Sequence, residues 1–308
     1  MTDIDTDIDI DIITPEILYD LAYGYSDFKD TWYLYIISNL TELNLPEEIP
    51  KIVHFALIQQ LYEFDKDLEK DLIIKIAKDC IISSKKYSEL FKNGNGEEEL
   101  PDLEIPNITQ GLKYHTEKKI IKKQMEIIDL IREMLLKISM FVGMPKSINS
   151  FMILISNIPK NLFSLGYKRN AITKEDSNGI DTINGKISQD SIHINSIMND
   201  LFKGSEYFKD FYGDENSNDM RKNLISISSD LWYFINNHLY SSLLSFNDIL
   251  DYKQTSLILI SCIIPQDIPN SHIIEQYYQS AINFGSTIEE LDNLKQLVSN
   301  FNQFIKSQ

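Results

Sequence analysis

The chain has 308 residues, of which 43% are hydrophobic, and its formal net charge is −17. The hydrophobic content is sufficient for a folded core and excludes a wholly disordered chain, while the negative charge without a basic run argues against nucleic-acid binding. The two cysteines, Cys80 and Cys262, are far apart in the sequence, so we predict buried free thiols and a reducing compartment. The sequence contains no run of about eighteen uninterrupted apolar residues, so no membrane span is predicted.

The first part of the chain predicts an acidic tail followed by helices. Residues 1–13 alternate Asp with Ile or Thr, and because clustered carboxylates repel one another we expect a disordered tail there. Thr14, Pro15 and Glu16 form a helix start, with a capping hydroxyl and a first-turn carboxylate. A first helical unit is therefore expected over residues 14–167. Helical periodicity is present over residues 32–43, 46–64 and 65–91, and the acidic, Gly-containing stretch at 93–106 predicts a surface loop.

The clearest helical pattern begins at Lys118 and ends at Gly143. Apolar residues return every third or fourth position, and the charged residues on the other side include Glu133 and Lys137, whose spacing predicts a solvated pair. Gly143 can adopt positive φ and Pro145 suits a first helical turn, so we predict a sharp corner and a second helix.

The second half predicts a linker and another helical unit. Residues 168–189 are rich in Asn, Ser, Asp and Gly and predict a linker loop, which leaves residues 190–308 as a second unit. A helix is expected over 190–211, ending near Gly213 and followed by an acidic loop. Ser229 is predicted to cap the next helix, and residues 252–264 form an apolar helix. Gly285 is expected to close a helix, and Thr287 with Glu290 to form a capping box for the last one.

Two stretches resemble known sequence motifs. The corner FVGMP and the run AINFGSTIEEL, from Ala281 to Leu291, are similar to motifs of the carboxymuconolactone decarboxylase and alkyl-hydroperoxidase-D-like superfamily. Ser286 replaces the usual Ala or Val of the second motif. The resemblance implies an all-α fold made of two fused helical units with long loops, like the tandem members found in fungi.

The redox residues of that superfamily are missing from this sequence. Its hydroperoxidase-like members use a Cys-x-x-Cys pair and a following His, because a lowered-pKa thiolate must attack and a second thiol must resolve the intermediate. The corresponding positions here are Asn270, Ile273 and Tyr277. Peroxidase activity is therefore not expected. Decarboxylase-type members keep the His as an acid or base, whereas a tyrosine with a pKa of about 10 is a poor base at neutral pH.

Two hypotheses about function follow from the resemblance, and the sequence leaves open whether the protein is an enzyme. In the first, the protein binds or transforms a small organic acid or lactone in a pocket near Tyr277, His238 and Lys253, the candidate catalytic residues. In the second, it is a catalytically degenerate structural or interaction protein, and Tyr277 is a half-buried aromatic residue that fills the pocket.

The remaining predictions concern cofactors, partners and localisation. The five histidines lack metal-ligand spacing, and there is no phosphate-binding or dinucleotide motif, so no cofactor and no metal is expected. No nucleic-acid or membrane partner is expected either, and the resemblance implies a homo-oligomer. The default compartment is the cytoplasm. The peroxisomal matrix is the alternative that fungal relatives suggest, although the final residues Lys306, Ser307 and Gln308 differ from an S-K-L address.

Overall fold

The computed structural model describes residues 12–59, 68–93, 100–101, 103, 117–164, 169, 194–267 and 271–308. Within these ranges every regular element is a helix and no strand is present, so the predicted all-α class is confirmed. The division into two fused units stays a prediction. Residues 1–11 of the acidic tail, most of the loop at 93–106 and the linker at 168–189 apart from Arg169 lie outside the described residues.

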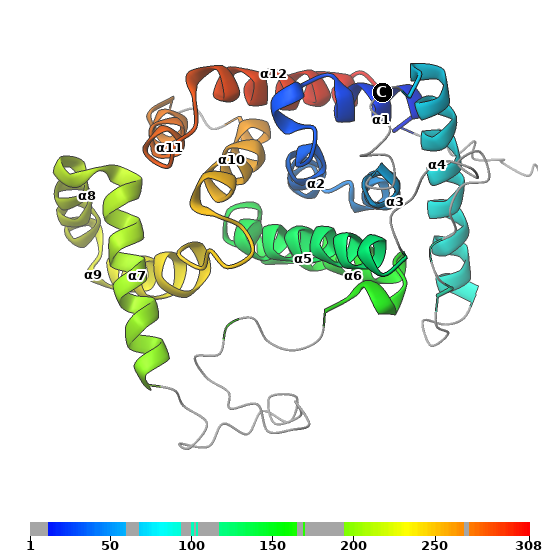
Figure 1. Cartoon of the computed structure of the whole chain (residues 1–308). Helices are drawn as coiled ribbons and strands as arrows, with labels where there is room; N and C mark the ends of the chain where they lie inside the picture. Colours follow the sequence, from blue (N-terminus) through cyan, green and yellow to red (C-terminus); the bar gives the residue numbers. More distant parts are fainter. Residues whose placement is uncertain are drawn as a thin grey trace, which may run out of the picture.

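The first half of the chain surrounds a helix that is buried on every side. All residues of α2 from Trp32 to Thr41 are buried, and this helix packs against α10, α5 and α3 (Figure 1). A helix that is apolar all round belongs in the interior of a protein. The helices of this half are α1 (Pro15–Tyr23), α2 (Trp32–Glu42), α3 (Ile49–Gln59), α4 (Lys70–Asn93), α5 (Glu117–Val142) and α6 (Met144–Ser156).

The second half adds a group of helices on one side and completes the centre. Figure 1 shows α7, α8 and α9 together at the left, while α10 lies in the middle beside α2 and α12 crosses the top. These elements are α7 (Ile194–Tyr212), α8 (Asp214–Ile227), α9 (Ser229–Phe234), the π-helix η6 (Ile235–Leu244), α10 (Tyr252–Ile263), α11 (Ser271–Asn283) and α12 (Ile288–Lys306). Short 3₁₀ turns occur at η1 (Ser26–Phe28), η2 (Pro46–Glu48), η4 (Lys160–Leu162) and η7 (Ile264–Gln266).

Several predicted helix ends are confirmed in atomic detail. The Thr14 hydroxyl accepts a hydrogen bond from the Ile17 amide, and Gly143 has φ +95° at the corner between α5 and α6. Gly285 also has φ +95° and follows α11. At the start of α12 the Glu290 amide donates to the Thr287 hydroxyl at 3.1 Å, and the Thr287 amide donates to the Glu290 carboxylate at 3.0 Å. Local sequence fixed these ends because each depends on neighbouring residues only.

Two local predictions in the second half were wrong. The acidic residues after Gly213 begin the helix α8 instead of a loop, because Asp214 and Glu215 occupy its first turn, where carboxylates interact favourably with the helix dipole. The cap of α9 is Ser228 and not Ser229, since the Ser228 hydroxyl accepts from the Leu231 amide at 3.2 Å.

The predicted solvated pair on α5 was also wrong. Glu133 is 4% exposed and Lys137 is 0% exposed. The Lys137 ammonium reaches the end of the π-helix and the segment after it, and Glu133 pairs with Arg169, so both side chains meet other parts of the chain instead of water. A pattern of charges on one helix cannot reveal this, since periodicity identifies an apolar face but not what packs on the polar one.

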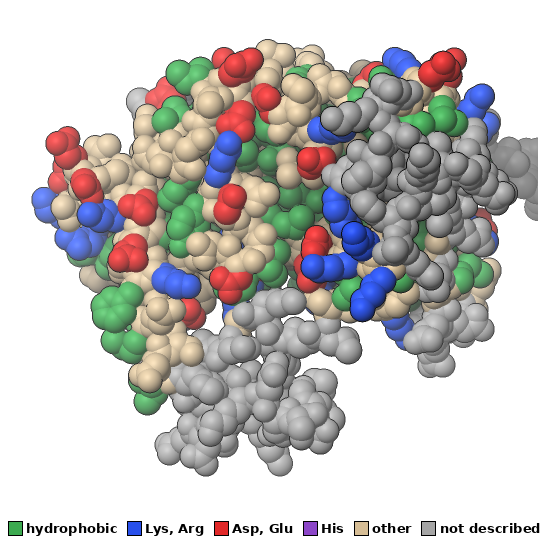
Figure 2. Space-filling view, in the orientation of Figure 1, with side chains coloured by type: hydrophobic (Ala, Val, Ile, Leu, Met, Phe, Trp, Pro, Cys, Tyr) green, Lys and Arg blue, Asp and Glu red, His purple; other side chains and the backbone are tan. Residues whose placement is uncertain are grey.

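The face seen in Figure 2 carries scattered acidic and basic side chains. Hydrophobic side chains gather at the lower left, over the free end of α7, where Ile194, Met198 and Phe202 are exposed. Within the described residues no helix combines the length and the apolar character that crossing a membrane requires.

Candidate functional site

Five tyrosines from four elements gather in the interior of the second half. We call Tyr207 and Tyr212 of α7, Tyr240 of η6, Tyr252 of α10 and Tyr277 of α11 the tyrosine cluster. The ring centroids of Tyr207 lie 4.9 Å from Tyr252 and 6.0 Å from Tyr240. The Tyr212 and Tyr240 rings are 6.5 Å apart. Five phenolic groups therefore share one region where several helices meet.

Phenylalanine rings connect Tyr277 to the rest of the cluster. The Phe211 ring centroid lies 5.3 Å from that of Tyr277 and 6.0 Å from those of Tyr207 and Tyr240. On its other side Tyr277 meets Phe141 of α5 edge to face at 6.1 Å. Edge-to-face contacts of this kind add to the stabilisation that ring burial provides. The cluster is thus a continuous aromatic region reaching from α7 to α5.

A glycine allows α7 to approach the π-helix closely. A Cβ atom on Gly204 would lie 2.4 Å from the Cα atom and 2.7 Å from the amide nitrogen of Ser241. No side chain fits in that space, so only glycine permits this contact. The close approach brings Tyr207 and Tyr240 into the same layer.

The π-helix decides which of its side chains face inward. The Ser245 amide donates to the Tyr240 carbonyl oxygen at 3.0 Å, which is the i to i−5 spacing of a π-helix. Tyr240 is buried in the cluster, whereas His238, two residues earlier, is exposed. π-Helical segments are rare and often occur at functional sites, so this element makes the region around it a candidate functional site.

The hydroxyls of the cluster differ in their hydrogen bonds. The Tyr212 and Tyr240 hydroxyls are 3.2 Å apart and bond to each other. The Tyr207 hydroxyl is fully buried and makes no hydrogen bond to the described residues. The nearby Ser256 hydroxyl opposes the rise in the Tyr207 pKa that burial causes, but its geometry falls short of a hydrogen bond. Buried polar groups are nearly always satisfied, so an orphaned hydroxyl points to a missing water or ligand.

Burial keeps the phenols of the cluster protonated. Removal from water raises the pKa of Tyr207 above its usual value, and it raises the pKa values of Tyr240 and Tyr277 well above theirs. The other tyrosines nearby add to the rise for Tyr240, because a second phenolate would be a like charge. At neutral pH the cluster can therefore donate hydrogen bonds but cannot act as a base.

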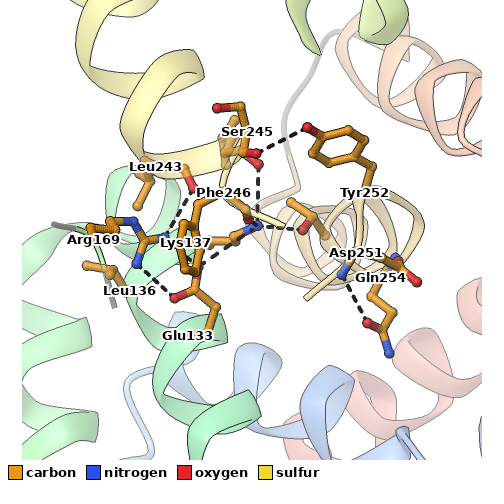
Figure 3. Close-up of polar contacts among 12 residues, drawn as sticks. Glu133, Leu136, Lys137, Arg169, Leu243, Ser245, Phe246, Asp251, Tyr252 and Gln254 are labelled. Carbon is orange, nitrogen blue, oxygen red and sulfur yellow. Dashed lines mark hydrogen bonds and ion pairs between the residues drawn. The ribbon is translucent and has the colours of Figure 1, made fainter. Parts of the chain in front are cut away.

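A buried ionic cluster lies next to the tyrosines, at the end of the π-helix (Figure 3). The Lys137 ammonium donates to the carbonyl oxygens of Leu244 at 3.3 Å and Phe246 at 2.7 Å, and to the Thr255 hydroxyl at 2.8 Å. Its Nζ atom is 3.9 Å from the Glu133 carboxylate. These contacts satisfy carbonyl groups that the helix end leaves without an intrahelical donor.

Arg169 completes this ionic cluster from outside the helices. Its guanidinium forms a two-bond pair with the Glu133 carboxylate, donates from Nε to the Ser242 carbonyl oxygen at 2.7 Å, and lies 4.1 Å from the Phe246 ring centroid (Figure 3). Burial lowers the pKa of Lys137 to about 7, with Glu133 opposing the shift and Arg169 adding to it. Lys137 and Arg169 thus act as caps for the π-helix.

The structure places the three predicted site residues in different surroundings. Tyr277 lies in the tyrosine cluster. His238 is exposed and touches the rings of Tyr233 and Phe234. Lys253 follows Tyr252 in the chain, but its ammonium pairs with the Glu290 carboxylate at 2.7 Å. No described contact links the three side chains, and their joint catalytic role stays a prediction.

The thiols and histidines offer no second reactive centre in the described part of the chain. Cys80 and Cys262 are buried free thiols, and burial raises the pKa of each, which disfavours the reactive thiolate. The His54 ring is also buried. It bonds to the Asn157 carbonyl oxygen at 2.9 Å and to the Ser83 hydroxyl at 3.2 Å, and burial lowers its pKa to about 4. No set of three metal-ligating side chains forms among the described residues.

Sequence reasoning missed Tyr207, Tyr212, Lys137 and Arg169. The run EYFKDFY on α7 carried a usable signal, because aromatic residues at helical spacing on both sides of a turn predict a wide buried face. Lys137 carried none, since its neighbours in space are more than a hundred residues away in the chain.

These features define an all-α protein with a buried tyrosine cluster and a capped π-helix. Peroxisomal protein 2 of Saccharomyces cerevisiae is 24% identical over 306 residues, which cover 94% of this chain and 94% of the relative. Peroxisomal protein 2 of Schizosaccharomyces pombe is 30% identical over 161 residues, which cover 52% of this chain and 63% of the relative. Both relatives are fungal proteins. No protein-family model matches the chain, and no solved structure matches it significantly.

Proposed function

We propose that the protein is a non-redox binding protein of the carboxymuconolactone decarboxylase-like fold, which takes a small lactone or organic acid at the tyrosine cluster. The observation that carries this proposal is the buried Tyr207 hydroxyl, which lacks a partner among the described residues. Such a group costs stability when it is left unsatisfied, and a ligand oxygen would satisfy it. The surrounding rings supply the apolar walls that small-molecule sites use.

The chemistry of the cluster favours a neutral carbonyl oxygen over a carboxylate. Its phenols stay protonated, so they are hydrogen-bond donors. The neighbouring cations Lys137 and Arg169 are engaged with the π-helix carbonyls and with Glu133, and so are not directed at the cluster. An ionised ligand would lose hydration without gaining a counter-charge. A lactone, or an acid in its protonated form, fits these groups best.

Binding is better supported than catalysis. Tyr277 stands where decarboxylase-type relatives of the fold carry a histidine, and the raised pKa of its phenol removes the base that proton abstraction at neutral pH requires. A second candidate function is favoured by the contacts of the same residue. Tyr277 packs between Phe141 and Phe211, as expected for a degenerate structural or interaction protein whose ancestral pocket is filled.

The compartment of this binding protein is proposed from its relatives. Both similar proteins carry the name Peroxisomal protein 2, which supports a peroxisomal location for this chain over the cytoplasm. A fluorescent fusion should therefore overlap a peroxisomal matrix marker in yeast cells. A diffuse signal throughout the cytoplasm would contradict the assignment.

The binding proposal is tested by melting the purified protein with a panel of lactones and small carboxylates. A ligand present at a hundredfold excess over its Kd should stabilise the fold by about 2.7 kcal/mol. The effect should disappear in Tyr207→Phe and persist in Tyr233→Phe, a matched change of an exposed tyrosine outside the cluster. Failure of every lactone and acid to shift the melting temperature would favour the structural function. So would a shift that Tyr207→Phe leaves intact.

A further inference from the structure

Helix α6 has its polar and apolar sides reversed. Its buried residues are Ser147, Ser150, Leu154 and Ser156, whereas its outer side carries four large apolar residues that are 51–59% exposed. A helix on the surface of an isolated protein normally shows the opposite arrangement. The outer residues follow the one-face spacing of a helix: Met144, Ile148, Met152 and Ile155. We call these four residues the α6 stripe.

Three of the four buried residues of α6 are serines, and their hydrogen bonds explain why small polar residues occupy its inner side. The Ser150 hydroxyl is 3.0 Å from the Thr41 hydroxyl of α2, and the Ser147 hydroxyl donates to the Leu135 carbonyl oxygen of α5 at 3.2 Å. These bonds, together with the buried Leu154 and the partly buried Phe151, fix α6 against the central helices. The apolar residues of the stripe are therefore not needed for the packing of α6 within the chain. Their exposure calls for a partner outside it.

The distribution of charged residues around the α6 stripe indicates which kind of partner would bind it. The chain has 46 acidic residues and a net charge of −17, yet the stretch from Met134 to Lys174 contains no Asp or Glu. Two copies of so acidic a chain repel each other except where the touching surfaces lack carboxylates. The α6 stripe is such a surface, which favours a second copy of the same chain.

A membrane or an acidic partner fits the stripe less well. The only cation within α6 is Lys146, and its ammonium is held by the Glu42 side chain at 2.9 Å and by the Glu42 carbonyl oxygen at 2.7 Å. A basic amphipathic helix that binds anionic lipid keeps its cations available on the polar side. Here the engaged cation leaves a neutral, apolar surface.

We propose that the α6 stripe is the contact surface of a symmetric dimer, in which α6 pairs with α6 of a second copy. A twofold axis places the same patch on both chains, so a stripe without charge is complementary to itself. Methionine adapts to an imperfectly matched surface, and Met140 at the end of α5 extends the exposed apolar area. A helix of 13 residues is only about 20 Å long, so the contact is smaller than a standard interface and the dimer should be concentration-dependent.

Sedimentation velocity of the full chain tests the proposal over about 1 to 100 μM, where a modest interface dissociates. The wild-type mass should rise from one chain to two. Ile148→Asp and Met152→Asp should each weaken self-association at least about tenfold, because they place a carboxylate in the contact. Phe202→Asp, a matched change of an exposed apolar residue on α7, should leave it unchanged.

A cross-linking measurement gives a second readout that does not depend on affinity. Both native thiols are buried, so the cysteine introduced by Met152→Cys would be the one thiol among the described residues that is exposed to solvent. Oxidation should produce a disulfide-linked dimer, since residues near a twofold axis meet their own copies. A wild-type chain that stays monomeric at the highest concentration would overturn the proposal. The proposal would also be overturned if Phe202→Asp dissociated the dimer while the stripe variants did not. Binding to lipid vesicles by a chain that never dimerises would overturn it as well.

Discussion

Replacing Tyr207 by Phe removes a fully buried hydroxyl of the tyrosine cluster that has no described partner, and it should stabilise the ligand-free protein. The ring contacts with Tyr252, Tyr240 and Phe284 remain, because they involve only the aromatic carbons. An unsatisfied buried hydroxyl costs about 1–3 kcal/mol, so we expect a gain of about 1 kcal/mol in the free energy of unfolding. For a chain of this length that gain corresponds to an increase of roughly 2 °C in Tm.

The same substitution at Tyr240 serves as the control. The Tyr240 hydroxyl bonds to that of Tyr212 at 3.2 Å, so Tyr240→Phe should lower the free energy of unfolding by about 1 kcal/mol. Both variants lose one oxygen from the same region, and they should move stability in opposite directions. Urea denaturation followed by circular dichroism measures both changes. A Tyr207→Phe protein destabilised as much as Tyr240→Phe would refute the assignment of an orphaned hydroxyl.

Two further predictions concern the π-helix. Gly204→Ala should destabilise the fold by about 3 kcal/mol in the same denaturation assay, because the new Cβ atom would meet the Ser241 backbone. Gly213→Ala is the control: the space around Gly213 is open, so only its positive φ opposes the change, at a cost of about 1 kcal/mol. Lys137→Met should cost about 3 kcal/mol or more, since it leaves the buried π-helix carbonyls without their donor and removes one of the two cations beside Glu133, which keeps Arg169. The folded-state pKa of Lys137 is lowered to about 7, so the unfolded chain binds more protons between pH 7 and 10, and wild-type stability should rise with pH relative to the methionine variant. Equal pH profiles for the two proteins would show that Lys137 does not titrate there.

The sequence alone determined the helices and many of their ends. Apolar periodicity located α5 and α10, and Gly143, Gly285 and the Thr287 capping box marked ends that the structure confirms. These features depend on contacts within a few residues, so the local sequence contains the information. The loop predicted after Gly213 failed because Asp214 and Glu215 stabilise the start of a helix as readily as they occupy a loop.

Only the tertiary structure decided which polar residues are buried and which aromatic residues meet. Lys137 looks like a solvated partner of Glu133 in the sequence, yet it reaches Phe246 and Thr255 at 2.7 and 2.8 Å across more than a hundred residues of chain. Tyr277 was found by its position in a motif, but the rings that pack against it come from α5 and α7. Apolar periodicity identifies one inner and one outer side of a helix, as if the helix packed against a single neighbour. A helix packed on several sides, or facing outward with its apolar residues as α6 does, is defined by the partners around it.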